Sequence, residues 1–312
     1  MIPLKINYSL ANDHSDLIIE RIDSRIASLK KNGFILNKKR YKPNKKVIKF
    51  LDFLLTNNAI KELILLSPEH FQAVSINYFN LFPDLKIDKS LIFKFCKNLF
   101  VDTAYSRYIN KADHIRNIVN DVCPYCNRSY ITILSREGKI KPQIDHFYPT
   151  SIYPFFAVSY FNLIPSCSTC NGLEVKNNND PNDFDLINPY LLNHSDFIFT
   201  YIPLQGKFAT SPFDSNVIKV KFRASKEGHL KLFKLEELYN THLDHVAELI
   251  FKSKIKYGKG FRKVLKNFPK LNLTDSDIDR FVLGSYSKDE DLHKRPLSKL
   301  YRDIAKELGL IK

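Results

Sequence analysis

Apolar residues recur at helical spacing over much of the chain, and at strand spacing in its middle and after residue 190. Near the start, a stripe at intervals of three and four residues predicts a helix that ends before Gly33: Leu17, Ile18, Ile22, Ile26 and Leu29. We expect this helix to begin at the polar cap residues of segment 12–15. With the elements below, the pattern predicts a mostly helical α+β protein.

Three more helical patterns precede residue 118. One carries the apolar stripe Phe50, Leu51, Leu54 and Leu55. The next begins at Ser67-Pro68-Glu69, which combines a cap, a proline at the first helical position and a carboxylate in the first turn. The last runs from Lys89 to about Asn110. We therefore expect residues 1–118 to form a helical region, with partner docking as a possible role.

After residue 190 the pattern starts with strands and continues with helices. Phe197–Ile202 predicts one strand; in a second, Ile218, Val220 and Phe222 alternate with Lys219, Lys221 and Arg223. Helices are expected over Leu235–Ile255, from the capping-box segment 274–277, and in an amphipathic stretch that ends at Gly309. Residues 191–312 are thus expected to form a short β-hairpin followed by a helical basic region.

The middle, residues 119–190, contains a different pattern. Tyr130–Leu134 is rich in strand-forming residues, 135–138 predicts a turn, and Ile140–Ile144 predicts a returning strand that Asp145-His146 closes. A long loop with two prolines follows, and then the short apolar run that starts at Asn162. A short helix is expected to begin at Asn171.

Two Cys-x-x-Cys pairs bracket this middle region, Cys123 with Cys126 and Cys167 with Cys170. Four thiolates suit the tetrahedral preference of Zn²⁺ and leave no open position, so the pattern predicts a structural zinc site. The alternatives are disulfides or a redox-active Cys-x-x-Cys. The duplicated spacing and the absence of a visible secretory signal favour zinc. The fifth cysteine, Cys96, lies in an apolar segment and is expected to be a buried apolar side chain.

The order of these residues resembles the HNH nuclease family, whose ββα-metal motif is a strand, a loop, a strand and a helix; the flanking cysteine pairs match its zinc-stapled branch. The resemblance implies that Asp145 binds a catalytic divalent ion and that His146 is the general base. It also implies that Asn162 pins the loop so that His146 keeps its orientation. Taken alone, His146 would be interpreted as a hydrogen-bonded structural histidine; the accompanying residues favour the catalytic role.

Asn171 falls where many members of that family have a final histidine ligand. This departure makes the sequence an H-N-N variant, and the HNH domains of RNA-guided CRISPR nucleases also carry Asn there. An amide oxygen is a hard donor suited to Mg²⁺. The implied catalytic ion is therefore Mg²⁺ or Mn²⁺, held by Asp145 and Asn171.

The residues around the motif resemble a smaller group within this family. CPYCNRSYI, QIDHFYP, YFNLIPSCSTCN and INPY resemble the HNH subunit of Septu-type anti-phage systems, a family with relatives that accompany some retrons. That resemblance is strong from about Asp121 to Tyr190. It implies a defence nuclease that works with an ATPase partner of the ABC/SMC type.

The charge of the chain agrees with a nucleic-acid substrate. The formal net charge is +15 and the pI is about 9.4, which suits a polyanionic partner. Segment 252–270 contains eight Lys/Arg and no acid, with aromatic residues between them. We expect phosphate contacts from Arg128, Lys176, Lys252, Lys254, Lys256, Lys259, Arg262 and Lys263. For single arginines such as Arg128, surface ion pairing is the simpler interpretation.

No apolar run approaches the ~20 residues of a membrane span, and no lipidation motif is visible, so we expect a cytoplasmic protein without a membrane partner. The expected activity is metal-dependent hydrolysis of phosphodiester bonds, most directly in DNA. Two alternatives stay open: a zinc-dependent nucleic-acid-binding module without catalysis, which Asn171 would favour, and an HNH ribonuclease acting on structured RNA such as tRNA.

Overall fold

The computed structural model describes residues 1–134, 141–204, 215–254, 259–268 and 271–311. Its contacts group the chain into two compact units. Unit 1 consists of Met1–Leu4, Asn120–Thr132 and Asp185–Lys312, and unit 2 of Lys5–Val119 and Ile133–Phe184. The two units are made of separate segments, so they differ from the three consecutive regions expected from the sequence. The division into three functional regions stays a prediction.

The protein is α+β, and about half of the described residues are helical. The described strands form three two-stranded antiparallel sheets. No helix in the described ranges is both long enough and apolar enough to cross a membrane.

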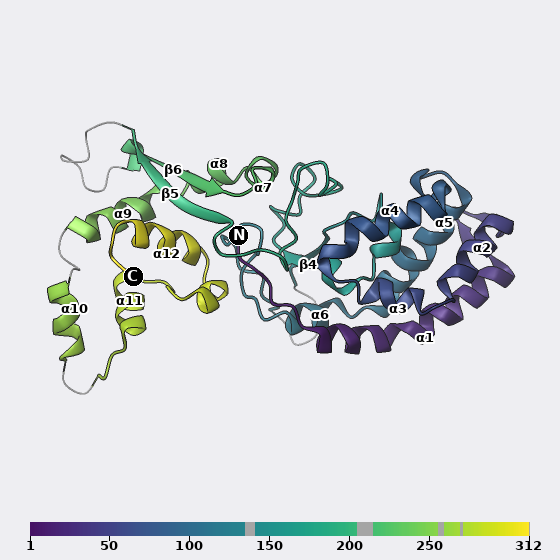
Figure 1. The fold of residues 1–312 in the computed structure, drawn as a ribbon, viewed down its shortest axis with the longest axis horizontal. Helices are drawn as coiled ribbons and strands as arrows, with labels where there is room; N and C mark the ends of the chain where they lie inside the picture. The colour runs from purple at the N-terminus through teal and green to yellow at the C-terminus, as the bar shows by residue number, and fades with distance from the viewer. Residues whose placement is uncertain (135–140, 205–214, 255–258, 269–270, 312) are drawn as a thin grey trace. The chain divides into compact units, whose positions relative to one another are not determined.

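The helices of unit 2 begin with α1 (Tyr8–Asn32), the long helix that Figure 1 shows beside the others. It starts at Asn7, whose side chain accepts a hydrogen bond from the Leu10 amide, and not at segment 12–15. Its buried face contains Ile18, Ile22, Ile26 and Leu29 as expected, whereas Leu17 is 70% exposed. Leu17 lies one position, about 100°, round the helix from Ile18, so it falls outside the stripe.

Further helices of unit 2 pack around α1, which contacts α2, α3 and the π-helix η3. They are α2 (Lys45–Leu54), α3 (Ala59–Ile64), α4 (Phe71–Leu81), α5 (Leu91–Lys97), η3 (Asn98–Tyr108) and α6 (Lys111–Asn117), with the 3-10 turns η1 (Pro68–His70) and η2 (Pro83–Lys86). The helix pattern expected from Lys89 to Asn110 is thus confirmed as α5 followed directly by η3. A small hairpin, β1 (Phe34–Leu36) with β2 (Lys39–Tyr41), follows α1.

The sheet that carries the predicted active site pairs β3 (Gln143–His146) with β4 (Leu163–Ser166). The expected partner of β3, Tyr130–Leu134, is not a strand; Tyr130 forms only an isolated bridge with Val122. All four residues of β4 are buried, so this apolar run gains more from pairing inside the unit than an exposed segment would. The turn expected at 135–138 lies outside the described residues.

Asn171 does not open a helix; residues 171–178 form turns. This segment contains Gly172 and several asparagines, and Asn177 adopts a positive φ of 31°. Such residues favour turns because they tolerate left-handed backbone angles and bond to nearby amides.

The loop between β3 and β4 is held against the helices of unit 2 by aromatic rings. It includes the 3-10 turns η4 (Pro154–Phe156) and η5 (Tyr160–Asn162). Phe71 of α4 stacks on Tyr148, with ring centroids 5.2 Å apart, and Tyr78 of α4 stacks on Phe155 at 4.9 Å. Helix α4 therefore packs against the loop that follows Asp145-His146.

Unit 1 is built on the twisted ribbon of β5 (Phe197–Pro203) and β6 (Ile218–Ala224), visible in Figure 1. The expected alternation is confirmed: Ile218 and Val220 are buried while Lys219 is exposed. Ile218 and Val220 belong to one hydrophobic core with Tyr239, Leu249 and Leu300. The helices are α7 (Gly228–Leu232), α8 (Leu235–Tyr239), α9 (Leu243–Lys254), α10 (Lys259–Lys266), α11 (Asp275–Leu283) and α12 (Ser298–Glu307), with the 3-10 turn η8 (Asp289–Lys294).

Two helix predictions in unit 1 have different outcomes. The single helix expected over Leu235–Ile255 is two helices, because Asn240 leaves the helical pattern and its side chain accepts a hydrogen bond from the Val220 amide at 3.0 Å. The capping box is confirmed: the Thr274 hydroxyl accepts from the Asp277 amide, and the Asp277 carboxylate accepts from the Thr274 amide.

Candidate active site and metal-binding cysteines

The first cysteine pair lies in a tight turn of unit 1. The Asn127 amide donates to the Cys123 carbonyl at 2.7 Å, and the Arg128 amide donates to the Cys126 sulfur at 3.4 Å. Asn127 is fully buried with a positive φ of 52°, and its side chain donates to the Leu292 carbonyl and accepts from the Lys299 amide. The Asn127 side chain therefore ties the turn to Leu292 and Lys299, and the Arg128 amide points at the Cys126 sulfur.

The second pair repeats this arrangement in unit 2. The Cys170 amide donates to the Cys167 sulfur at 3.4 Å, and the Asn171 amide donates to the Cys167 carbonyl at 3.1 Å. Amide donors stabilise a thiolate, which is the form of cysteine that binds metal.

The four sulfur atoms lie within 4.8 Å of one another, and all four cysteines are buried. This is the one group of three or more His, Cys, Asp or Glu side chains with metal-site geometry among the residues that the structure describes. A buried set of four sulfur donors fits a metal such as zinc and offers no open coordination position. Cys96 is also fully buried, and burial raises the pKa of its thiol, as expected for an apolar role.

Asp145 and His146 form the end of β3. Asp145 faces Ile164 across the sheet and is 2% exposed, while His146 faces Leu163 and keeps part of its surface accessible. Neighbouring residues of a strand point to opposite faces, so the two side chains leave the sheet in different directions. They nevertheless share Tyr105 and Lys176 as neighbours.

The imidazole of His146 is oriented by the loop that follows it. Its Nε2 lies 3.1 Å from the carbonyl oxygen of Ala157. A backbone carbonyl can only accept a hydrogen bond, so Nε2 carries the proton and Nδ1 presents its lone pair. Burial lowers the pKa of His146 to about 4, with opposition from the Ala157 bond and support from Lys111 and Lys176. The ring is therefore neutral at physiological pH.

Asn162 ties that loop together from inside. It is 0% exposed, and its Oδ1 accepts from the Tyr148 amide at 2.7 Å. Its Nδ2 donates to the carbonyls of Tyr148 at 3.1 Å and Phe156 at 3.0 Å. Tyr148 comes two residues after His146, and Phe156 directly precedes Ala157. The side chain thus ties Tyr148, two residues beyond the histidine, to Phe156, the neighbour of the residue whose carbonyl orients His146.

Two residues from the helices of unit 2, Tyr105 and Lys111, lie beside the Asp145-His146 dipeptide. The Tyr105 ring of η3 lies edge-on to His146, with centroids 4.4 Å apart, and the Lys111 ammonium of α6 lies 4.4 Å from the Tyr105 centroid. Burial raises the pKa of Tyr105 to about 12, and the charge of Asp145 adds to that shift. Tyr105 is therefore near both Asp145 and His146. Nothing in the sequence around Tyr105 or Lys111 marked them, because only the fold brings η3 and α6 to β3.

Lys176, for which we expected a phosphate contact, lies in the interior of unit 2. Its side chain is fully buried, its ammonium donates to the Asn179 carbonyl at 2.9 Å, and it lies 5.8 Å from the Phe147 ring centroid. Burial lowers its pKa, while Asp145 and Asp180 raise it. It contributes positive charge close to Asp145 from the interior of the unit.

Asn171 is partly exposed at the other end of the same strand face. Its Nδ2 donates to the side-chain oxygen of Gln143 at 3.0 Å. Gln143 and Asp145 are two residues apart on β3 and so share a face of the sheet. Asn171 therefore lies on the side of the sheet from which Asp145 projects, with its amide engaged by Gln143.

The residues expected to bind nucleic acid in unit 1 differ in exposure. Lys252 pairs with Glu248 at 2.7 Å, and Arg262 pairs with Asp279 at 2.5 Å and donates to the Leu310 carbonyl. Lys254 and Lys263 are exposed, Lys259 begins α10, and Lys256 lies outside the described residues. Arg128 is half-buried beside the Cys126 knuckle. Lys252 and Arg262 thus already have structural partners.

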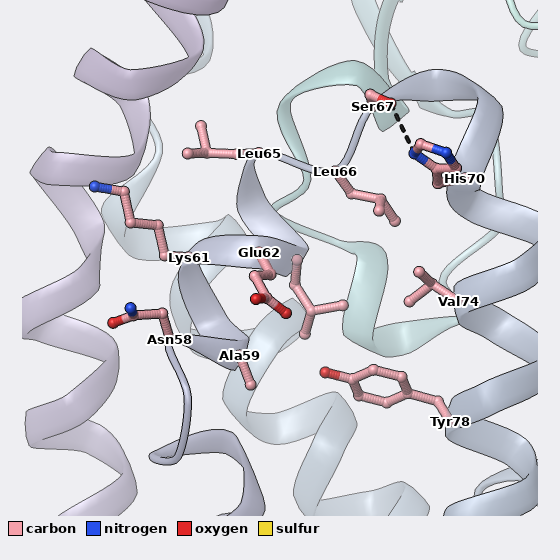
Figure 2. Close-up of a pocket in the computed structure, with 11 residues that line it drawn as sticks. Asn58, Ala59, Lys61, Glu62, Leu65, Leu66, Ser67, His70, Val74 and Tyr78 are labelled. Atoms are coloured by element: carbon pink, nitrogen blue, oxygen red, sulfur yellow. Dashed lines mark hydrogen bonds between the residues drawn. The ribbon is translucent and has the colours of Figure 1, made fainter.

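A separate pocket of about 610 Å³ lies between α3 and α4. Figure 2 shows Glu62, Lys61 and Tyr78 around it, and Ser67 hydrogen-bonded to His70 at 3.1 Å. None of the residues predicted for catalysis lines this pocket.

Comparison with known proteins finds one informative similarity. The chain is 37% identical over 90 residues to the Septu protein PtuB of Bacillus thuringiensis, a match that covers 28% of this chain and 32% of that protein. The similarity thus spans about a third of the relative's length. No protein-family profile matches the chain, and no solved structure matches it.

Proposed function

We propose that this protein is a metal-dependent HNH endonuclease that hydrolyses phosphodiester bonds, with DNA as its substrate. The observation that carries the proposal is the orientation of the His146 imidazole, which is held by the Ala157 carbonyl on a loop pinned by the buried Asn162. The order of Asp145, His146 and Asn162 between two Cys-x-x-Cys pairs supports the same assignment.

In this proposal His146 is the general base. Its Nδ1 takes a proton from the attacking water, the water oxygen bonds to phosphorus, and the bond from phosphorus to the leaving oxygen breaks. The Ala157 carbonyl keeps the tautomer with the lone pair at Nδ1. Asn162 holds the loop in place, so it is a positioning residue.

The residues around Asp145 fit a hard divalent cation such as Mg²⁺ or Mn²⁺. Asp145 supplies a buried carboxylate oxygen, and Asn171 supplies an amide oxygen from the same side of the sheet. Such an ion, when bound, neutralises the charge that develops on the phosphate and the leaving oxygen. The contact of Asn171 with Gln143 uses Nδ2 and not the amide oxygen.

We further propose that the four cysteines hold a structural Zn²⁺. Their closeness and burial support this, as do the amide donors to the Cys126 and Cys167 sulfurs.

The similarity to a Septu protein supports a role in anti-phage defence. On this proposal the nuclease acts with an ATPase of the ABC/SMC type. Co-purification of the chain with an ATPase encoded beside it tests the partnership: recovery of both proteins in one stoichiometric complex supports it, and separate elution contradicts it.

The test of the activity is a cleavage assay on plasmid, single-stranded DNA and tRNA, with Mg²⁺, Mn²⁺ or EDTA, and with and without the ATPase. We expect metal-dependent DNA cleavage. Cleavage of tRNA alone would support the ribonuclease alternative. Metal-independent binding with no cleavage of any substrate would support the binding-module alternative.

A further inference from the structure

A cation that the motif does not include lies beside the proposed base. Lys111 is the first residue of α6, and the side chain of Asn110 fixes this helix start by accepting hydrogen bonds from the Ala112 and Asp113 amides. The Lys111 ammonium lies 4.4 Å from the centroid of the Tyr105 ring, which in turn lies 4.4 Å from the His146 ring. One aromatic ring thus connects the ammonium to the imidazole.

The charges around Lys111 are unusual for a structural lysine. It forms no ion pair with any residue that the structure describes. The nearby carboxylate of Asp113 is bonded to Arg116 and Asn110 instead. Burial lowers the pKa of Lys111, and the charge of Lys141 lowers it further. A partly desolvated ammonium gains from contact with an anion.

We propose that Lys111, supported on the Tyr105 ring, contacts a phosphate oxygen of the strand that is cleaved beside His146. Lys111 is then a catalytic-site residue contributed by the helical region, and Tyr105 is its positioning residue. This inference rests on the proposed nuclease function and adds a substrate contact that lies outside the Cys-bracketed segment. A lysine is suited to this role because its ammonium binds phosphate as a compact point charge.

The ring of Tyr105 is the part that the proposal requires. A cation over an aromatic face is attracted by the ring quadrupole, and that contact fixes the direction of a long, flexible side chain. The hydroxyl is not required, so Tyr105→Phe should keep Lys111 in place, whereas Tyr105→Leu should release it.

The experiment measures binding in a His146→Ala background, so that the nucleic acid is not cut during the measurement. Lys111→Ala should weaken affinity for duplex DNA about tenfold, as expected for a lost charged hydrogen bond. It should also lower the slope of log affinity against log salt by about 0.9, the value for one phosphate contact. Lys111→Arg should restore most of both.

Lys94→Ala is the matched control. Lys94 is also half-buried, and its ammonium lies 5.1 Å from the Tyr41 ring centroid, so this variant removes the same charge and the same kind of ring contact on α5. It should leave affinity and salt slope unchanged. Equal effects of Lys94→Ala and Lys111→Ala would overturn the proposal, because general charge would then explain both.

Kinetics in the otherwise unmodified protein separate this inference from the proposed function. If the wild-type chain cleaves and Lys111→Ala raises KM with the expected loss of affinity, both stand. If the wild-type chain cleaves and Lys111→Ala changes neither KM, kcat nor the salt slope, the Lys111 contact is refuted and the nuclease function stands. If the wild-type chain cleaves no substrate, the proposed function is refuted.

Discussion

Replacing Asn162 tests the geometry of the candidate site most closely. Its buried side chain makes three hydrogen bonds, with the Tyr148 amide and with the carbonyls of Tyr148 and Phe156. Asn162→Ala leaves these buried groups without partners. Each such group costs about 1–3 kcal/mol, and water that enters the space recovers part of this, so we expect a loss of about 2–4 kcal/mol in the free energy of unfolding.

Asn162→Asp is the more informative variant because it keeps the size and shape of the side chain. The carboxylate can still accept from the Tyr148 amide, but it cannot donate to the two carbonyls, which would then face negative charge. We expect this variant to be destabilised, and its loop to shift near Ala157, whose carbonyl orients His146. A displacement of about 1 Å at a catalytic group can cost about 10²-fold in rate.

The assay combines denaturant unfolding with single-turnover cleavage, measured at a temperature where each variant is fully folded. Asn178→Ala, an exposed change in the same unit, serves as the control and should match the wild type in both. Loss of stability with a wild-type cleavage rate would show that Asn162 supports the fold alone. Wild-type stability in Asn162→Ala would refute the reasoning from its hydrogen bonds.

Three other predictions address zinc, pH and charge. Cys167→Ser should lose bound zinc and much of its solubility, since a structural zinc site contributes on the order of 10 kcal/mol in small domains; one zinc per chain by elemental analysis of this variant would contradict the site. The pKa of the buried His114 is lowered to about 3, first by burial and then by His14. The unfolded chain therefore binds a proton at His114 more readily than the folded chain does. The folding stability from this difference is fully present above the unfolded pKa of ~6.5 and is lost as pH falls below it. Between pH 7 and 5.5 the wild type should therefore lose about 1 kcal/mol more unfolding free energy than His114→Gln, and parallel denaturation curves would refute this. Lys263→Ala should lower the salt slope of DNA binding by up to ~0.9, whereas Lys252→Ala, which removes an amine paired with Glu248, should change it less. Equal slopes in these two variants and the wild type would move the binding surface elsewhere.

Local signals in the sequence predicted the parts of the site that depend on short spacing. Each Cys-x-x-Cys places its sulfurs within one turn, and the capping box at Thr274 lies within one helix start, so neither depends on distant residues. The alternation in Ile218–Ala224 was equally readable because period 2 directly produces a buried face.

Other features of the site depend on partners far along the chain. Strand β3 pairs with Leu163–Ser166 and not with Tyr130–Leu134. This pairing buries all four residues of β4, which a pattern of neighbouring residues does not reveal. For Lys176 the sequence predicted a phosphate contact but not the burial of its alkyl chain or the hydrogen bond of its ammonium to the Asn179 carbonyl. The positions of Tyr105 and Lys111 beside His146 could not be predicted from the sequence. The two residues belong to η3 and α6, which come close to His146 only in the folded unit.

The proposed role of His146 as the base of a metal-dependent nuclease can be tested by one comparison. Cleavage of plasmid DNA by the wild-type chain and by His146→Ala should be measured with Mg²⁺ and with EDTA, alongside DNA affinity and thermal stability. We expect cleavage only with metal, and a rate that falls about 10²–10⁴-fold in His146→Ala while affinity and stability stay close to the wild type. Cleavage at the wild-type rate by His146→Ala would show that His146 is not the base.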